Sequence, residues 1–134
     1  MSSLSLAFHR LGSLPYFYSL SGKLLPWAGG FCIVLFGIGL YTGLALAPTD
    51  YEQGDSYRII YVHVPAAWMS MFVYVVLAIA GTIALVWRLK LAEVVARASA
   101  PIGASYTFLA LATGSIWGKP MWGTWWIWDA RLTS

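Results

Sequence analysis

Long uncharged stretches alternate with short polar ones along this chain. Residues 27–47 carry no charged side chain over 21 positions, residues 59–87 none over 29, and residues 99–117 none over 19. A helix of about 20 apolar residues crosses the hydrocarbon core of a bilayer. The pattern therefore predicts three transmembrane helices, at about 27–47, 63–87 and 99–117, in a single membrane domain that takes in residues 1–134.

The composition agrees with an all-α, polytopic membrane protein. Hydrophobic residues make up 60% of the chain and charged residues only 10%, whereas soluble domains have about 25% charged residues. The connections between the predicted spans, Pro48–Arg58 and Arg88–Ala98, are too short to be domains. Gly39 and Gly43 form a G-x-x-x-G spacing, which is a weak indication of close helix packing.

Basic residues are divided unevenly between the two sides of this three-span arrangement. Five of the eight fall in the N-terminal tail and the second connection: Arg10, Lys23, Arg88, Lys90 and Arg97. Because loops rich in lysine and arginine stay in the cytoplasm, we expect a cytoplasmic N-terminus and an outward-facing first loop and C-terminal segment. The net charge of +3 follows from this bias and gives no reason to expect a nucleic-acid partner.

The chain is richest in tryptophan just after the third predicted span. Residues 117–129, WGKPMWGTWWIWD, hold five tryptophans and one carboxylate. Gly118 is expected to end the span, and Pro120 suits the first turn of a new helix. The residues at i, i+3, i+4 and i+7 spacing would then share one face of it: Trp122, Trp125, Trp126 and Asp129. We therefore predict a short helix lying in the outer membrane interface, within residues 118–134.

Two explanations fit such a dense cluster of tryptophans. Tryptophans often anchor membrane helices at the headgroup level as an aromatic belt. Alternatively, their flat faces could hold a planar aromatic ligand such as a porphyrin. A belt spreads its rings over several helix ends and has no use for an acid such as Asp129 on the tryptophan face. The sequence leaves both explanations open.

His63 is the second candidate for chemistry. It precedes Pro65 by two residues, and proline is tolerated in the first turn of a helix, so the second span is expected to begin near His63. This places the imidazole at the outer end, level with the tryptophans, as a structural residue, a metal ligand or a proton relay. Haem would need an axial nitrogen and apolar surroundings. Arg58 and Lys119 lie on the side where its propionates would need cations, although each also fits an ordinary interface residue.

Motifs for catalysis are missing from the sequence. There is no G-x-x-x-x-G-K, no serine-nucleophile motif and no H-E-x-x-H, so we do not expect an enzyme. Glu93 is expected to pair with Arg97 at i+4 on the cytoplasmic side rather than to take part in a reaction. The single cysteine, Cys32, has no C-x-x-C-H context, so any haem would be held without covalent attachment.

Residues 122–134, WGTWWIWDARLTS, resemble the W-G-x-x-W-x-W-D signature of the haem-handling membrane proteins of cytochrome c maturation, and among them the heme exporter protein C family. The stretches 54–67, 100–104 and 113–121 resemble the same family, so the similarity covers nearly everything from residue 48 onward. The resemblance implies six spans and a function in haem export for c-type cytochrome biogenesis. Haem b would be held non-covalently at the periplasmic face of the bacterial inner membrane, between the tryptophans and two axial histidines.

The resemblance also implies partners. Haem would pass to a membrane-anchored periplasmic haem chaperone, and the protein would work beside ATP-binding-cassette transporter subunits and a small single-span membrane subunit, in contact with membrane lipid. Two other functions remain possible. One is a haem–apocytochrome ligation subunit, although the outer loops here are short for that function. The other is a purely structural membrane subunit whose tryptophans only anchor it.

By position, His63 matches the family's first axial histidine and would bind the haem iron. The signature residues that match are Trp122, Gly123, Trp126, Trp128 and Asp129, and Trp125 fills a variable place. The family continues into further spans that supply the second axial histidine, whereas this sequence stops at Ser134. Its other histidine, His9, is expected in the cytoplasmic tail. We therefore expect a C-terminally truncated fragment of such a protein.

Overall fold

A computed structural model describes residues 13–128. Helices make up nearly all of this part: α2 (Leu14–Tyr41), a π-helical turn η1 (Thr42–Leu46), a 3-10 turn η2 (Asp55–Ile59), α3 (Ile60–Trp87) and α4 (Lys90–Trp122). Three helical segments are long and apolar enough to cross a membrane, namely α2 with η1, η2 with α3, and α4. The predicted all-α, polytopic architecture with three spans is thus confirmed for the described residues.

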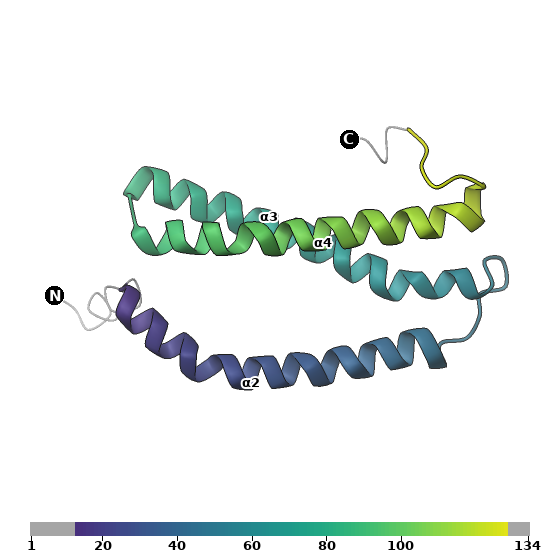
Figure 1. Ribbon diagram of the computed structural model, residues 1–134, viewed down its shortest axis with the longest axis horizontal. Coiled ribbons are helices and arrows are strands. Elements are labelled where there is room, and N and C mark those ends of the chain that lie inside the picture. The colour runs from purple at the N-terminus through teal and green to yellow at the C-terminus, as the bar shows by residue number, and fades with distance from the viewer. Residues whose placement is uncertain (1–12, 129–134) are drawn as a thin grey trace.

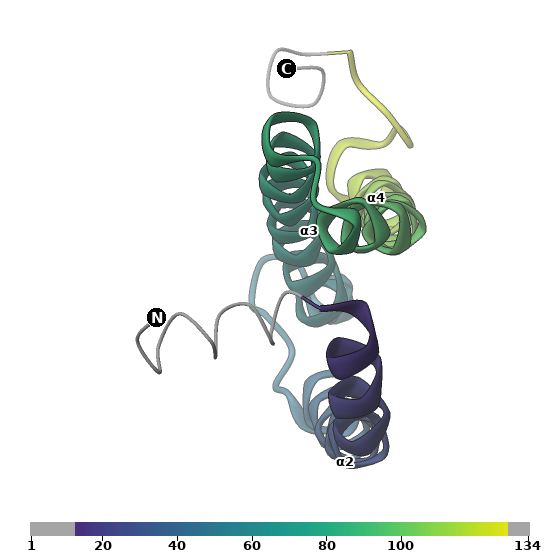
Figure 2. The same cartoon turned by 90° about the vertical axis from the view of Figure 1, so that its left-hand side faces the viewer.

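The helices α3 and α4 form an antiparallel hairpin, and α2 lies to one side of it (Figure 1). The hairpin helices cross near their middles and pack against each other along most of their length. Seen along its length, the molecule shows α2 set apart from this pair (Figure 2). The start of α2 and the α3–α4 turn lie at one end, and the 47–59 connection and the end of α4 lie at the other. Of the basic residues predicted on one side, Lys23, Arg88, Lys90 and Arg97 belong to the elements at the first of these ends, and Arg10 lies outside the described residues.

Small residues let α3 and α4 approach closely. The buried apolar side chains of the described residues, Ala66, Val73 and Ala80, recur every seven residues along α3. Opposite them, Gly103 of α4 lies so near that an added Cβ would be 3.1 Å from Val73 Cγ1. In membranes, helix association depends on such close packing and on interhelical hydrogen bonds. The large apolar side chains instead cover the outside, as expected for helices facing lipid or further protein.

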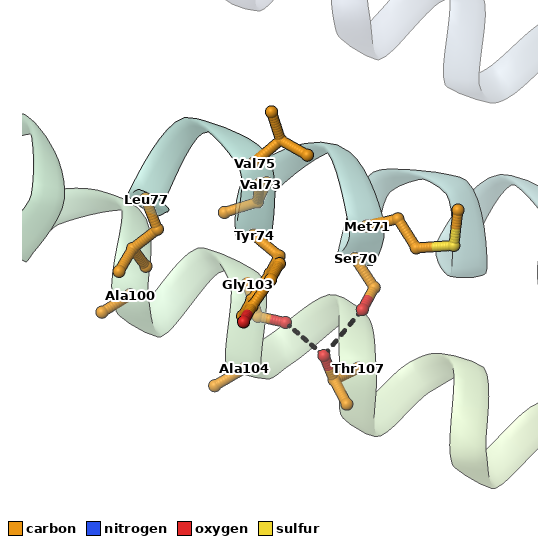
Figure 3. A pocket seen from close by; sticks show the side chains of 10 residues that line it. All are labelled: Ser70, Met71, Val73, Tyr74, Val75, Leu77, Ala100, Gly103, Ala104 and Thr107. Atoms are coloured by element: carbon orange, nitrogen blue, oxygen red, sulfur yellow. Dashed lines mark hydrogen bonds between the residues drawn. The ribbon is translucent and has the colours of Figure 1, made fainter. Parts of the chain in front are cut away.

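The stripe on α3 that faces α4 also includes polar residues. Counting by alternate steps of three and four gives positions 63, 66, 70, 73, 77 and 80, which share one face of a helix. At the middle of the stripe, the hydroxyls of Ser70 and Thr107 are 2.8 Å apart (Figure 3). His63 occupies the outer end of this stripe, so its side chain is directed at α4 and not at lipid.

The turn between α3 and α4 is shorter than the sequence predicted. Arg88 takes a left-handed conformation (φ 53°) and Leu89 is extended, after which α4 begins at once. The expected 88–98 connection is therefore wrong, because most of it is the first part of α4. Its charged residues are compatible with an exposed helix: Arg97 donates to Glu93 at 2.6 Å, which confirms the predicted pair. An uncharged run of residues predicts which part of a helix lies inside the membrane, but the helix itself can extend beyond that run.

The connection before α3 is a structured loop. Pro48 disfavours a helical residue before it, so Ala47 is extended (ψ 135°) and η1 ends. The Asp50 carboxylate accepts the backbone N–H groups of residues 52 and 53, each at 2.9 Å. Arg58 closes the loop by donating to the carbonyl of Ala47 through Nε at 3.2 Å and Nη2 at 3.0 Å. The entry to α3 is thereby tied to the end of the first span.

The predicted interfacial helix does not form within the described residues. Gly118 does not end the third span; it is buried in α4, where a Cβ would lie 3.2 Å from Cε3 of Trp122. The helix continues through Pro120 and ends when Gly123 adopts φ 75°, a left-handed conformation that glycine takes without strain. Residues 123–128 then run in non-helical conformation (Figure 1). The prediction that Trp122, Trp125 and Trp126 share one face of a helix is therefore wrong.

Candidate functional site

The imidazole of His63 is held against α4 near the outer end of the hairpin. Its Nδ1 is 3.0 Å from Oγ1 of Thr113, and its ring meets Trp117 edge-to-face with centroids 5.8 Å apart. Gly114 makes room for the ring, since a Cβ there would lie 3.1 Å from its Cε1. The histidine is half-buried. Three neighbours on one helix thus fix the position of the side chain.

The chain after α4 folds back over this histidine. A cavity of about 260 Å³ is lined by His63, Ala110, Leu111, Gly114, Trp117, Trp122, Trp125, Trp126 and Ile127. Four of these residues are tryptophans, so the walls are flat and apolar. Small-molecule sites usually measure about 300–1,000 Å³. The cavity is therefore large enough to hold part of a planar aromatic ligand. It is too small for these residues alone to enclose the whole ligand.

Four of the nine predicted site residues line this cavity, but they come together in a different way from the one expected: His63, Trp122, Trp125 and Trp126. Trp122 is the last residue of α4, and Gly123 turns the chain so that Trp125 and Trp126 return toward His63. A loop rather than a helical face brings them together. Trp128 packs edge-to-face on Trp126 with centroids 5.9 Å apart, and is itself 84% exposed. It supports the cavity from outside. Asp129, the acid of the predicted site, lies outside the described residues.

The indole N–H of Trp126 stands out in this loop. Its Nε1 is buried and has no hydrogen-bond partner among residues 13–128. A buried donor without a partner costs about 1–3 kcal/mol. Trp126 thus lines the cavity while its own N–H is buried and unpaired within the described residues.

The two predicted cations lie beside the cavity, not in it. Arg58 and Lys119 line a neighbouring hollow of about 500 Å³, and Trp117 and Trp125 belong to the walls of both. The ammonium of Lys119 donates to the carbonyl of Gly123 at 2.9 Å and lies 5.7 Å from the centre of the Trp125 ring. An ammonium has three N–H groups, so this contact leaves donors for an anion.

Arg58 is more fully engaged than Lys119. Besides its two hydrogen bonds to Ala47, its Nη1 lies 3.4 Å from Oδ1 of Asp55. The guanidinium therefore closes the loop, and its charge is partly balanced by a neighbouring carboxylate. This arrangement favours the structural explanation that the sequence left open for Arg58.

Three residues of the site were not singled out from the sequence. Trp117 and Thr113 contact His63 directly, and Gln53 accepts the indole N–H of Trp117 at 3.0 Å through Oε1. The last contact spans the first loop and α4. A signal for Trp117 was present, since Trp117 and Gly114 continue on α4 the stripe of residues 100, 103, 107 and 110. Nothing in the sequence pointed to Gln53.

The fold and this site define a class: a polytopic, all-α membrane protein with a histidine in a tryptophan-lined cavity at one end of a helical hairpin. Comparison with known protein families matches residues 7–134 to the family described as heme exporter protein C. The chain belongs to that family, which confirms the resemblance expected from its motifs.

Individual relatives agree with this assignment. The heme exporter protein C of Escherichia coli K12 is 54% identical over 126 residues, which are 94% of this chain and 51% of the relative. That of Bradyrhizobium diazoefficiens is 58% identical over 118 residues, 88% of this chain and 44% of the relative. A putative cytochrome c biosynthesis ccmC-like mitochondrial protein of Marchantia polymorpha is 50% identical over 105 residues, 78% of this chain and 46% of the relative. The chain thus spans about half the length of these curated relatives.

Proposed function

We propose that this chain carries the first part of a haem site in a membrane protein that delivers haem for cytochrome c maturation. One observation carries the proposal: His63 lies in a cavity walled by four tryptophans. Haem needs an axial nitrogen and apolar contacts on the faces of the ring. The names of the relatives, heme exporter and cytochrome c biosynthesis proteins, support the same function.

The side chains in and beside the cavity suit the different parts of a haem group. His63 would bind the iron of haem b. The rings of Trp122, Trp125 and Trp126 would contact the macrocycle, and Lys119 would meet a propionate from the neighbouring hollow. Haem would be held without covalent bonds, since the single cysteine, Cys32, is exposed on α2, which does not line the cavity.

Location and partners follow from the same proposal. The site end of the hairpin would face the periplasm from the bacterial inner membrane, because the opposite end carries most of the basic residues. There the exposed rings of residues 122–128 would be available to a membrane-anchored haem chaperone. The transporter subunits and the small single-span subunit are proposed on family resemblance alone. Transfer of haem between binding sites makes or breaks no covalent bond in the chain, so we propose transport and not catalysis.

Replacing His63 tests the proposal. In the intact membrane protein that carries this sequence, His63→Ala should abolish the Soret absorbance of the purified protein, and added imidazole should restore part of it. The matched control is His9→Ala, which changes the other histidine of this sequence and should leave the spectrum unaltered. A normal Soret band in His63→Ala protein would remove His63 from the site.

A structural membrane subunit is the second candidate. Trp122 and Trp125 are each 58% exposed and Trp128 is 84% exposed, as expected for an aromatic belt. In that case the purified protein would have no Soret band, and exchanging any one of these tryptophans for leucine would have little effect.

A further inference from the structure

Thr113 makes more hydrogen bonds than a passive neighbour of His63 would need. Its Oγ1 lies 2.6 Å from the carbonyl oxygen of Leu109, one helical turn back, and 3.0 Å from Nδ1 of His63. It is also 3.2 Å from the carbonyl oxygen of Ala110. A hydroxyl has one proton to donate and lone pairs to accept with. The question is which neighbour receives that proton.

The carbonyl oxygen of Leu109 determines where the hydroxyl proton of Thr113 points. A carbonyl oxygen only accepts, so the 2.6 Å contact between Thr113 and Leu109 needs the hydroxyl proton between the two oxygens. If the proton pointed at His63 instead, two oxygens would face each other at that distance with no hydrogen between them. The hydroxyl therefore donates to the backbone and accepts from the imidazole. In neutral histidine one ring nitrogen carries the proton and the other an open lone pair, so Nδ1 is the protonated nitrogen.

The other ring nitrogen is left as an acceptor. Nε2 of His63 has no hydrogen-bond partner in the part of the chain that the structure describes, and the side chain lines the tryptophan cavity. Gly114 and Trp117 hold the ring from its sides. Metal-binding histidines use one nitrogen for the metal, while a hydrogen bond at the other sets the tautomer and the orientation of the ring.

We propose that Thr113 is a positioning residue that keeps His63 in the Nδ1–H tautomer, so that Nε2 offers its lone pair to a metal in the tryptophan cavity. The proposal rests on the proposed haem site, and it adds the group that sets which nitrogen binds. Serine could replace threonine in this role, but valine, which has the same shape and no hydroxyl, could not.

The tautomer can be measured without haem. The intact protein is labelled with ¹⁵N in its histidine rings and studied by solid-state NMR in lipid bilayers, and the signals that disappear in His63→Ala protein are assigned to His63. We expect a protonated Nδ1 and an unprotonated Nε2 in the wild type and in Thr113→Ser. In Thr113→Val the Nδ1–H tautomer should lose its dominance. A protonated Nε2 in the haem-free wild type would overturn the proposal.

Haem affinity supplies the second measurement. Loss of such a supporting contact typically lowers metal affinity about 10–100-fold, so Thr113→Val should bind added haemin that much more weakly, while Thr113→Ser stays near the wild type. The matched control is Thr107→Val, which also removes one helix-carbonyl bond and one contact with α3, here with Ser70, but at mid-span and away from His63. Wild-type affinity in Thr113→Val would refute the positioning role. If His63→Ala kept its haem while the tautomer was as expected, the haem site would fail and the tautomer assignment would stand.

Discussion

Replacing Trp126 by leucine separates a haem platform from a membrane anchor. Trp126 is half-buried, lines the cavity with His63 and supports its ring on Trp128. An aromatic side chain buries about 150–250 Å², and exchange for leucine would lose roughly 50–100 Å² of contact with a ligand. At about 25 cal/mol per Å², this is about 1–2.5 kcal/mol. The expected result is haem binding weakened by about 5- to 70-fold.

The assay is titration of the purified, haem-depleted protein with haemin in detergent, followed at the Soret band. Trp87→Leu is the matched control, because Trp87 ends α3 at the far end of the hairpin and is 64% exposed, as an interfacial anchor would be. It should bind haem as the wild type does. Equal affinity of the wild type and Trp126→Leu, with both inserted normally in the membrane, would refute the platform and favour the aromatic belt.

Three further predictions concern the support of the site. Gly43→Ala should lower the stability of the detergent-solubilised protein by about 1–3 kcal/mol in thermal unfolding, because its Cβ would lie 2.8 Å from a side-chain carbon of α3; Gly39→Ala, with nothing within 4 Å, should not. Gln53→Leu removes the acceptor of the Trp117 indole and should weaken haem binding about fivefold, as expected for one hydrogen bond of about 1 kcal/mol, and an unchanged dissociation constant would show that the bond is incidental. Asp129→Asn should impair haem transfer to the chaperone less than Asp129→Ala, because asparagine keeps one acceptor oxygen; full transfer by both variants would leave the acid of the motif without a role.

The sequence allowed the number of spans, their order and the position of His63 near the start of the second span to be predicted, because these depend on local features: uncharged runs and a histidine close to a proline. Helix ends were less predictable. Lys90 and Glu93 looked like parts of a loop, yet an exposed helix accommodates them. Gly118 looked like a helix breaker, but the ring of Trp122 packs on it only if the helix continues.

The contacts of the site depended on tertiary structure. Thr113 is one of several hydroxyl residues in an apolar helix, and only the pairing of α3 with α4 shows that it faces His63. The seven-residue spacing of Ala66, Val73 and Ala80 would have indicated which face of α3 packs against another helix, and His63 lies on that same face. The partnership of Gln53 with Trp117 joins positions 64 residues apart and follows no periodicity.

The two-residue turn between α3 and α4 bears on how the protein is assembled. Helices joined so tightly can enter the bilayer together as one hairpin, and contacts between neighbouring elements form quickly because little chain entropy is lost in closing them. The contacts of His63 with Thr113 and Trp117 lie wholly inside this hairpin. The first span touches it mainly near Gly43. The orientation of the histidine thus depends on contacts within the hairpin and not on the placement of α2.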